Sequence, residues 1–257
     1  MAKPKVGIFD FTGCEGCELQ ILNCEDILLD VLGLIDVVNF REGMSNGRDD
    51  YEIALVEGGI STPADVERIK KIREKASLLI TLGSCASIGG INALKNHRPM
   101  EDAVRTVYGD KGKHIKTIPA VPHSAVVKVD FSIPGCPLDK KEFARCLTEL
   151  LAGRTPSIPD HPVCLECKML ENVCQFDKGK TCLGPVTRAG CEARCPSNNA
   201  PCDGCRGLIS LPNLNAQKDV LAKNGLTVDR IMDRFRLFQG ALKEVVGGLV
   251  QPQESKK

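Results

Sequence analysis

Short apolar segments alternate with amphipathic ones through the first part of the chain. Five of them are rich in β-branched or apolar residues and are bounded by Gly, Pro or charged residues, a pattern typical of buried strands. These predicted strands are Lys5–Phe9, Ile35–Asn39, Ile53–Val56, Leu78–Leu82 and Val129–Ile133. Between the third and the fourth, Ala64–Lys75 repeats apolar residues at every third position among charges, and this spacing predicts an amphipathic helix.

The alternation of strands and helices predicts an α/β fold, a parallel, doubly wound sheet with helices on both faces. Among such sheets we expect the flavodoxin-like strand order rather than the order of dinucleotide-binding domains. This first domain is expected to cover residues 1–153.

The pattern changes after that domain. Residues 154–162 contain three prolines and read as a linker, and residues 160–257 are expected to form a second, mostly irregular domain with short helices. Residues 164–205 show almost no apolar periodicity, so we expect this segment, unaided, to bury too little apolar surface to offset the entropy lost on ordering. Bonds between thiolates and metal could supply the missing stability. Two helices are predicted to follow, over Leu214–Lys223 and Val228–Val246, the second behind a threonine N-cap.

Composition adds fourteen cysteines to this picture. The chain opens with MAKPKVGIFD and shows neither a basic leader nor an apolar run long enough to span a bilayer, so we expect a cytoplasmic protein without a membrane span. Thiols stay reduced in that compartment unless a metal binds them, whereas a secreted disulfide scaffold would be short and carry a leader. The net charge is +1, there is no Trp and there are only two Tyr, so we expect no nucleic-acid partner.

Four cysteines fall just after predicted strands. Cys14 and Cys17 follow the first strand, and Cys85 and Cys136 follow the fourth and the fifth. Because ligands of an open α/β sheet gather at the carboxyl ends of its strands, these thiols could converge on one metal cluster. A helix that starts near Cys17 would direct its positive end towards such an anionic cluster. Taken alone, Cys14 and Cys17 could be a redox-active dithiol, but two further thiols at equivalent strand ends favour four thiolates.

The irregular segment carries two more groups of four cysteines. They are Cys164, Cys167, Cys174 and Cys182, followed by Cys191, Cys195, Cys202 and Cys205. The spacing within these groups does not separate zinc from iron–sulfur, and two zinc ribbons would give a binding module without redox function. Three cysteine tetrads in one chain are suited to conducting electrons, which favours a redox metal.

Five motifs carry a resemblance over nearly the whole chain. They are Cys14-Glu-Gly-Cys17, Gly83-Ser-Cys85, Gly135-Cys-Pro137, Cys182-Leu-Gly-Pro-Val-Thr-Arg-Ala-Gly-Cys191 and Pro201-Cys-Asp-Gly-Cys205. In this order they are similar to the small, electron-transfer subunit of nickel–iron hydrogenases. The likeness is greatest to the cytoplasmic branch of that family, whose small subunits lack an export leader and a membrane anchor.

By this resemblance each tetrad holds one 4Fe–4S cluster. The proximal cluster would be bound by Cys14, Cys17, Cys85 and Cys136, the medial cluster by Cys191, Cys195, Cys202 and Cys205, and the distal cluster by Cys164, Cys167, Cys174 and Cys182. The resemblance also implies an obligate large subunit, whose nickel–iron centre splits hydrogen, and a flavin- or ferredoxin-type redox subunit. The chain itself would contain no catalytic residue.

The sequence departs from the exported members of that family at two places. Those members have His-x2-Cys where this chain has Cys164 and Cys167, and three thiolates around a medial 3Fe–4S cluster where Cys195 adds a fourth. We therefore expect three 4Fe–4S clusters at more reducing potentials. Oxygen-tolerant relatives carry an extra cysteine where this chain has Gly16, so ordinary oxygen sensitivity is expected. The iron–sulfur subunit of a quinone-reductase-type complex is the nearest alternative, but it has adjacent cysteines in its first motif and no eight-cysteine tail.

The remaining candidates are expected to take no part in the chemistry. Cys24 and Cys146 lie at helical spacing from apolar residues and read as buried apolar side chains. His161 could replace a thiolate at the distal cluster, but four cysteines are already available there. The residues expected at the surface or in loops are Glu15, Glu18, His97, His114 and His123.

Overall fold

The computed structural model describes residues 3–24 and 33–241. Five parallel strands form one sheet in the order β2-β1-β3-β4-β5, which confirms the flavodoxin-like prediction. The strands are β1 (Lys5–Phe9), β2 (Asp36–Phe40), β3 (Ile53–Glu57), β4 (Leu78–Leu82) and β5 (Phe131–Ile133). Each predicted strand is present, although β2 is displaced by one residue and β5 begins two residues later than predicted.

Regular pairing of β5 begins late because of the side chain of Asp130. Its carboxylate accepts a hydrogen bond from the backbone N–H of Leu79 over 2.8 Å and forms an ion pair with Arg73. The N–H of Leu79 is thus bonded to a side chain rather than to a backbone carbonyl, and the ladder starts at Phe131.

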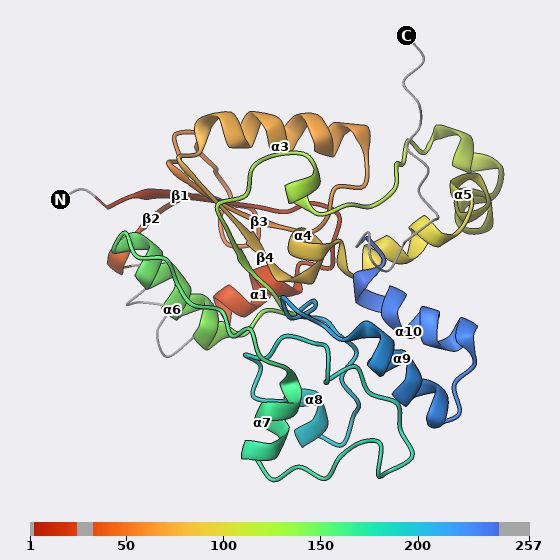
Figure 1. The fold of residues 1–257 in the computed structure, drawn as a ribbon. Helices are drawn as coiled ribbons and strands as arrows, with labels where there is room; N and C mark the ends of the chain where they lie inside the picture. The colour runs from red at the N-terminus through yellow and green to blue at the C-terminus, as the bar shows by residue number, and fades with distance from the viewer. Residues whose placement is uncertain (1–2, 25–32, 242–257) are drawn as a thin grey trace.

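Helices cover both faces of the sheet (Figure 1). On one face lies α3 (Pro63–Lys75), with Ile69 and Ile72 buried against the strands. On the other lie α1 (Gly16–Leu22) and α6 (Lys140–Leu151). Each buried isoleucine contributes about 1.5–3 kcal/mol relative to exposure, so the predicted apolar stripe of α3 fixes this helix on the sheet.

α3 begins one residue before its predicted start because Thr62 caps it. The side chain of Thr62 accepts a hydrogen bond from the N–H of Asp65 over 3.2 Å, and the carboxylate of Asp65 accepts one from the N–H of Thr62 over 2.9 Å. This reciprocal capping box, with Pro63 in the first turn, satisfies donors that a helix start otherwise leaves free.

Short helices fill the long connection between β4 and β5. They are α4 (Gly83–Ile88), a 3-10 helix over Gly90–His97, α5 (Met100–Tyr108), and two further 3-10 helices over Gly109–His114 and His123–Ala125. Of the histidines predicted at the surface or in loops, His114 is exposed and His97 is half-buried.

His123, in contrast, is completely buried, so that prediction was wrong for it. Its Nε2 lies 2.9 Å from the carbonyl oxygen of Gly58, and its ring packs edge-on against Phe11 with 4.6 Å between centroids. Among the described residues Nδ1 has no hydrogen-bond partner. Burial lowers the pKa of His123 to about 4, so the imidazole is neutral at physiological pH.

The cysteine-rich part lies below the sheet in Figure 1 and is flanked by the last two helices. Its helices are α7 (Val163–Met169), α8 (Arg194–Ser197), α9 (Leu214–Lys223) and α10 (Val228–Gln239). Thr227 caps α10 as predicted, with its side chain accepting from the N–H of Arg230, and the helix ends at Gln239 rather than at the predicted Val246. Residues 242–246 of that prediction lie outside the described residues.

The cysteine-rich part has an apolar core that the last two helices complete. Leu183 and Val186 are buried against Leu221 of α9 and against Ile231 and Phe235 of α10. The prediction concerned residues 164–205 unaided, and the apolar partners here come from helices that follow later in the chain. α10 also contacts the 3-10 helix after α4, so it packs against both parts of the molecule. Within the described ranges, no helix is long and apolar enough to cross a bilayer.

Replacing His123 with Gln should weaken the pH dependence of stability. In the folded protein the imidazole stays neutral down to about pH 4, whereas in the unfolded chain it takes up a proton below about pH 6.5. Stability is therefore lost as the pH falls through this window, and the wild type should lose about 2 kcal/mol more than H123Q between pH 7.5 and pH 5. Urea unfolding of the anaerobic proteins at both pH values measures the difference, and equal losses would contradict the expectation.

Candidate iron–sulfur sites

Four cysteines meet at the carboxyl end of the sheet. Cys14 lies in the loop after β1, Cys17 in the first turn of α1, Cys85 in α4 directly after β4, and Cys136 after β5. The charges of Cys85 and Cys136 both act on Cys17, and the charge of Cys14 acts on Cys85 and Cys136. The structure therefore brings the predicted first group together, while the binding of a cluster by these thiols stays a prediction.

Burial is the largest influence on these thiols. It raises the pKa of Cys85 to about 11, with the charges of Cys136 and Cys14 next, and it raises the pKa of Cys17 further still. The backbone of Leu138 opposes the rise in the pKa of Cys17. Because thiolates rather than thiols bind metal, cationic iron would both remove these protons and offset the mutual repulsion of the sulfur atoms.

Gly83 leaves room for the sulfur of Cys17. It stands at the start of α4 with a φ of +77°, and a Cβ at this position would overlap Cys17 Sγ. Only glycine combines that backbone conformation with the close approach of the thiol.

Glu57, at the end of β3, is a residue of this site that sequence reasoning missed. Its buried carboxylate accepts hydrogen bonds from the backbone N–H groups of Cys17, over 3.2 Å, and of Glu18, over 2.7 Å. α1 starts where predicted, but these first N–H groups are taken by Glu57 instead of being free for a cluster. Burial raises the pKa of Glu57, and the two hydrogen bonds oppose the rise. An acidic residue that ends an otherwise apolar strand is the signal that could have identified it.

Glu18 is buried, so the prediction that it is solvated was wrong. It is 1% exposed, and within the described residues neither carboxylate oxygen has a hydrogen-bond partner. Burial raises its pKa to about 8, and the charge of Glu57 adds to the rise. Its position in the first turn of α1 turns the side chain inward beside Glu57. Glu15, at the N-cap, is half-buried.

α7 and the loop after it carry the Cys164 group. Cys164 and Cys167 lie on α7, Cys174 is exposed in the following turn, and Cys182 is buried. The pKa of Cys164 is raised to about 11, mainly by burial and next by the charges of the other three thiols. The backbone N–H of Gly184 donates to Cys182 Sγ over 3.4 Å. Because the charges of Cys167, Cys174 and Cys182 all act on Cys164, the four predicted members are neighbours.

The Cys191 group surrounds α8. Cys195 lies on this helix, and after burial the charge of Cys191 is the largest influence raising its pKa. Burial raises the pKa of Cys205 to about 12, and both Cys191 and Cys195 add to that rise. The charge of Cys205 acts in turn on Cys202, which is almost completely buried. These four thiols are also neighbours.

Hydrogen bonds link the three groups in a row. The hydroxyl of Ser84, the residue before Cys85, donates to the carbonyl oxygen of Cys205, and the N–H of Cys202 donates to Cys182 Sγ over 3.2 Å. The group at the sheet edge therefore adjoins the Cys191 group, which adjoins the Cys164 group.

The donor chemistry fits iron–sulfur clusters. Such clusters are held by cysteine thiolates and tuned by burial and by N–H groups that bond to sulfur. Each group here offers four thiols, and two N–H groups donate to the buried sulfur of Cys182. In the part of the chain that the structure describes, no three His, Cys, Asp or Glu side chains are arranged to hold a single metal ion.

Three further candidates are two cysteines and a histidine. Cys24 and Cys146 are buried in the apolar core beneath the sheet, which confirms their prediction. His161 is half-buried, its Nδ1 lies 3.5 Å from the carbonyl oxygen of Pro162, and its carbonyl accepts from the N–H of Ala189. Nothing in these contacts indicates a ligand.

Comparison with known proteins identifies the family. The family model described as "NADH ubiquinone oxidoreductase, 20 Kd subunit" matches residues 14–150. The chain is 39% identical to sulfhydrogenase 2 subunit delta of Pyrococcus furiosus over 91% of its own length and 98% of the relative. It is 36% identical to one subunit of the F420-non-reducing hydrogenase of Methanocaldococcus jannaschii, over 91% and 93% of the two chains. The chain belongs to the small-subunit family of nickel–iron hydrogenases.

A solved structure agrees with this assignment. The chain is 26% identical to a chain in the structure of an NAD+-reducing NiFe-hydrogenase in the H2-reduced state, with a TM-score of 0.55, over 62% of this chain and 96% of that one. The resemblance predicted from the five motifs is thereby confirmed. In this hydrogenase small subunit the family-model match ends before residues 164–205, so the eight-cysteine segment lies beyond the part shared with the 20 Kd subunit.

Replacing Gly83 with Ala should remove one cluster from this small subunit. The added Cβ displaces Cys17 Sγ, so the variant should bind about four iron atoms fewer than the wild type. The matched control is G153A, because Gly153 has a φ of +71° but nothing within 4 Å of its Cβ position. Both variants carry the backbone strain of about 1–2 kcal/mol, which urea unfolding reports, but only G83A should lose iron. Equal iron contents would show that the thiol does not need this space.

Proposed function

We propose that this small subunit conducts electrons between the nickel–iron site of a large subunit and a further redox subunit, and that it does not itself activate hydrogen. The observation that carries the proposal is the row of three four-thiol groups, joined where the hydroxyl of Ser84 meets the carbonyl oxygen of Cys205 and where the N–H of Cys202 meets Cys182 Sγ. Cofactors bound in adjoining groups are suited to passing electrons along the row. The family assignment to hydrogenase subunits supports the same reading.

Each group would hold one 4Fe–4S cluster, which supplies one-electron redox chemistry when bound. The proposed ligands are Cys14, Cys17, Cys85 and Cys136 for the proximal cluster, Cys191, Cys195, Cys202 and Cys205 for the medial cluster, and Cys164, Cys167, Cys174 and Cys182 for the distal cluster. The protein's own contribution is to fix the sulfur atoms and to tune the potentials by burial and N–H bonds.

The large subunit would cover the carboxyl edge of the sheet. Cys14 and Cys136 are exposed there, and Leu19 of α1 is 48% exposed beside them. A cluster at an open edge would be vulnerable to water and oxygen, so a permanent cover is expected. We propose an obligate interface in the size class of about 2,000 Å² or more.

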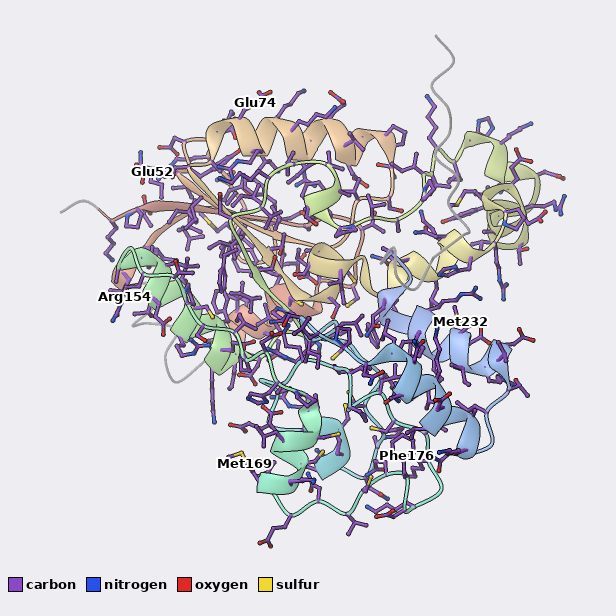
Figure 2. All side chains as sticks on the ribbon, in the orientation of Figure 1. Glu52, Glu74, Arg154, Met169, Phe176 and Met232 are labelled. Carbon is purple, nitrogen blue, oxygen red and sulfur yellow. The ribbon has the colours of Figure 1, made fainter. Side chains whose placement is uncertain are left out.

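The further redox subunit would dock around Cys174. Four apolar residues shortly before this exposed thiol are between 44% and 75% exposed: Leu165, Met169, Leu170 and Val173. Met169 reaches outward from the end of α7 (Figure 2). Exposed apolar side chains gathered at one place mark interaction surfaces, and a flavin- or ferredoxin-type subunit is the partner we propose for this one.

The cellular setting follows from the thiols. All fourteen cysteines are free, which suits the reducing cytoplasm that we propose as the location. The names of the relatives refer to different chemistry, since one is a sulfhydrogenase, one is F420-non-reducing and one is NAD+-reducing. The family assignment therefore does not specify which molecule finally accepts the electrons.

Anaerobic purification from the native source tests the proposal directly. This chain should contain about twelve iron and twelve sulfide, three clusters of four, and should copurify with a nickel-containing subunit. Metal and sulfide analysis after separation of the subunits gives both results. Two zinc and no sulfide would replace the proposal with a zinc-stabilised binding module, and a stable monomer without a nickel-containing partner would contradict the role in a hydrogenase.

Replacing Cys195 with Ala should convert the medial cluster to 3Fe–4S. Three thiolates favour loss of the fourth iron, and the potential should rise because the cluster loses one thiolate and one iron. The oxidised variant should show a paramagnetic signal that the wild type lacks. Hydrogen oxidation with a high-potential dye should survive, while reduction of a low-potential acceptor should fall. C24A is the control, because Cys24 belongs to no tetrad. Spectra identical to those of C24A would mean that Cys195 is not a ligand.

A further inference from the structure

Arg206 follows Cys205 and is buried between the two parts of the molecule, with a side chain that is 1% exposed. Its Nη1 and Nη2 donate to the two carboxylate oxygens of Glu142 on α6, over 2.8 Å and 2.9 Å. Its Nε donates to the carbonyl oxygen of Ala189 over 2.7 Å, and Nη1 also donates to that of Pro134 over 3.0 Å. One planar group therefore binds a helix and two separate loops.

Both loops lead directly into proposed ligands. Pro134 lies two residues before Cys136 of the proximal group, and Ala189 lies two residues before Cys191 of the medial group. Arg206 itself is the next residue after Cys205, whose carbonyl oxygen accepts a hydrogen bond from the hydroxyl of Ser84, the residue before Cys85. The guanidinium thus touches the backbone on both sides of the junction between the two groups.

The chain provides a dedicated space for this side chain. Gly190 has a φ of +108°, and a Cβ there would lie 2.5 Å from Arg206 Nη2 and 3.0 Å from a carboxylate oxygen of Glu142. Any larger residue would push the guanidinium away from its carboxylate. The ion pair and the glycine between Ala189 and Cys191 therefore depend on one another.

Stability alone does not account for a buried pair of this kind. Desolvation of two charges offsets much of their attraction, and well-packed apolar residues often serve as well or better. A guanidinium differs from an apolar side chain in offering a rigid fork that fixes several acceptors at set positions. Here the fixed acceptors are backbone carbonyls beside ligands of two different groups.

We propose that Arg206 is a positioning residue that sets the separation between the proximal and medial clusters, with Glu142 as its charge partner. The inference rests on the proposed function, because it assumes that both groups bind clusters. The side chain makes no contact with reacting atoms in this role. It acts through the two carbonyls and through its own link to Cys205.

The experiment uses the complete hydrogenase complex carrying R206K, which keeps the charge but loses the fork. Three readouts are compared: iron content, the magnetic interaction between the reduced proximal and medial clusters, and turnover. Isotope exchange between deuterium gas and the protons of water reports the partner's nickel–iron site alone. Hydrogen-dependent dye reduction also needs electron transfer through the clusters of this subunit. We expect full iron content and unchanged exchange, an altered magnetic interaction, and dye reduction lowered about tenfold.

The matched control is R194K, which also keeps the charge. Arg194 also precedes a proposed medial ligand and also pairs with the start of α6, through Asp139 over 2.7 Å, but its side chain is 57% exposed. Exposed pairs of this kind contribute little, so R194K should behave as the wild type in all three readouts. If R206K is indistinguishable from R194K, the positioning role is overturned.

A second variant decides the matter if R206K does not fold. E142L/R206M removes both charges together, which avoids leaving one of them buried alone. It should load iron and still show the altered interaction and slower dye reduction, and wild-type values of both would overturn the inference. A wild-type chain without about twelve iron atoms would instead contradict the proposed function itself, so the two failures are distinct.

Discussion

The electrostatic cost of gathering thiolates in a buried place is the constraint on which this molecule depends. Burial is the first cause of the raised pKa at Cys85, Cys164 and Cys205, and neighbouring thiol charges add to it. Without a cationic partner such sulfur atoms stay protonated, and with one they become ligands. The parallel sheet, the glycine beside Cys17 and the N–H groups directed at sulfur are all arranged around that requirement.

The sheet could be predicted because its signals are local. Apolar runs in a strand–helix alternation indicate buried parallel strands, and the carboxyl-end rule then places cysteines after β1, β4 and β5 at one edge. The errors of boundary have local physical causes as well. Thr62 extends α3 by a cap, and Asp130 delays β5 by bonding a strand N–H with its side chain. Neither hydrogen bond is visible in an apolar pattern.

The features that could not be predicted depend on partners distant in sequence. The role of Glu57 becomes evident only from the hydrogen bonds that its carboxylate accepts from N–H groups of α1. The burial of His123 becomes evident only from the contact between its ring and the carbonyl oxygen of Gly58. The core around Leu183 is completed by residues of α9 and α10. These helices lie outside residues 164–205, so the composition of that segment gives no sign of them. The apolar burial of such a segment is therefore underestimated when only its own residues are counted. That the cysteines of that segment form two groups of neighbours could be predicted, because the members of each group are close in sequence.

The difference in sequence span between the groups has a consequence for biosynthesis. Both groups of the cysteine-rich part lie within one continuous segment, from Cys164 to Cys205, so their members meet by closing short loops. The group at the sheet edge contains Cys14 and Cys136. Its members meet only once β3 has paired with both β1 and β4, and β5 has paired with β4. A nascent chain that has not yet reached Cys136 offers three of its four thiols there. On the proposed ligand set, iron delivered to that edge would have all four thiols only after the strands up to β5 have been synthesised and folded.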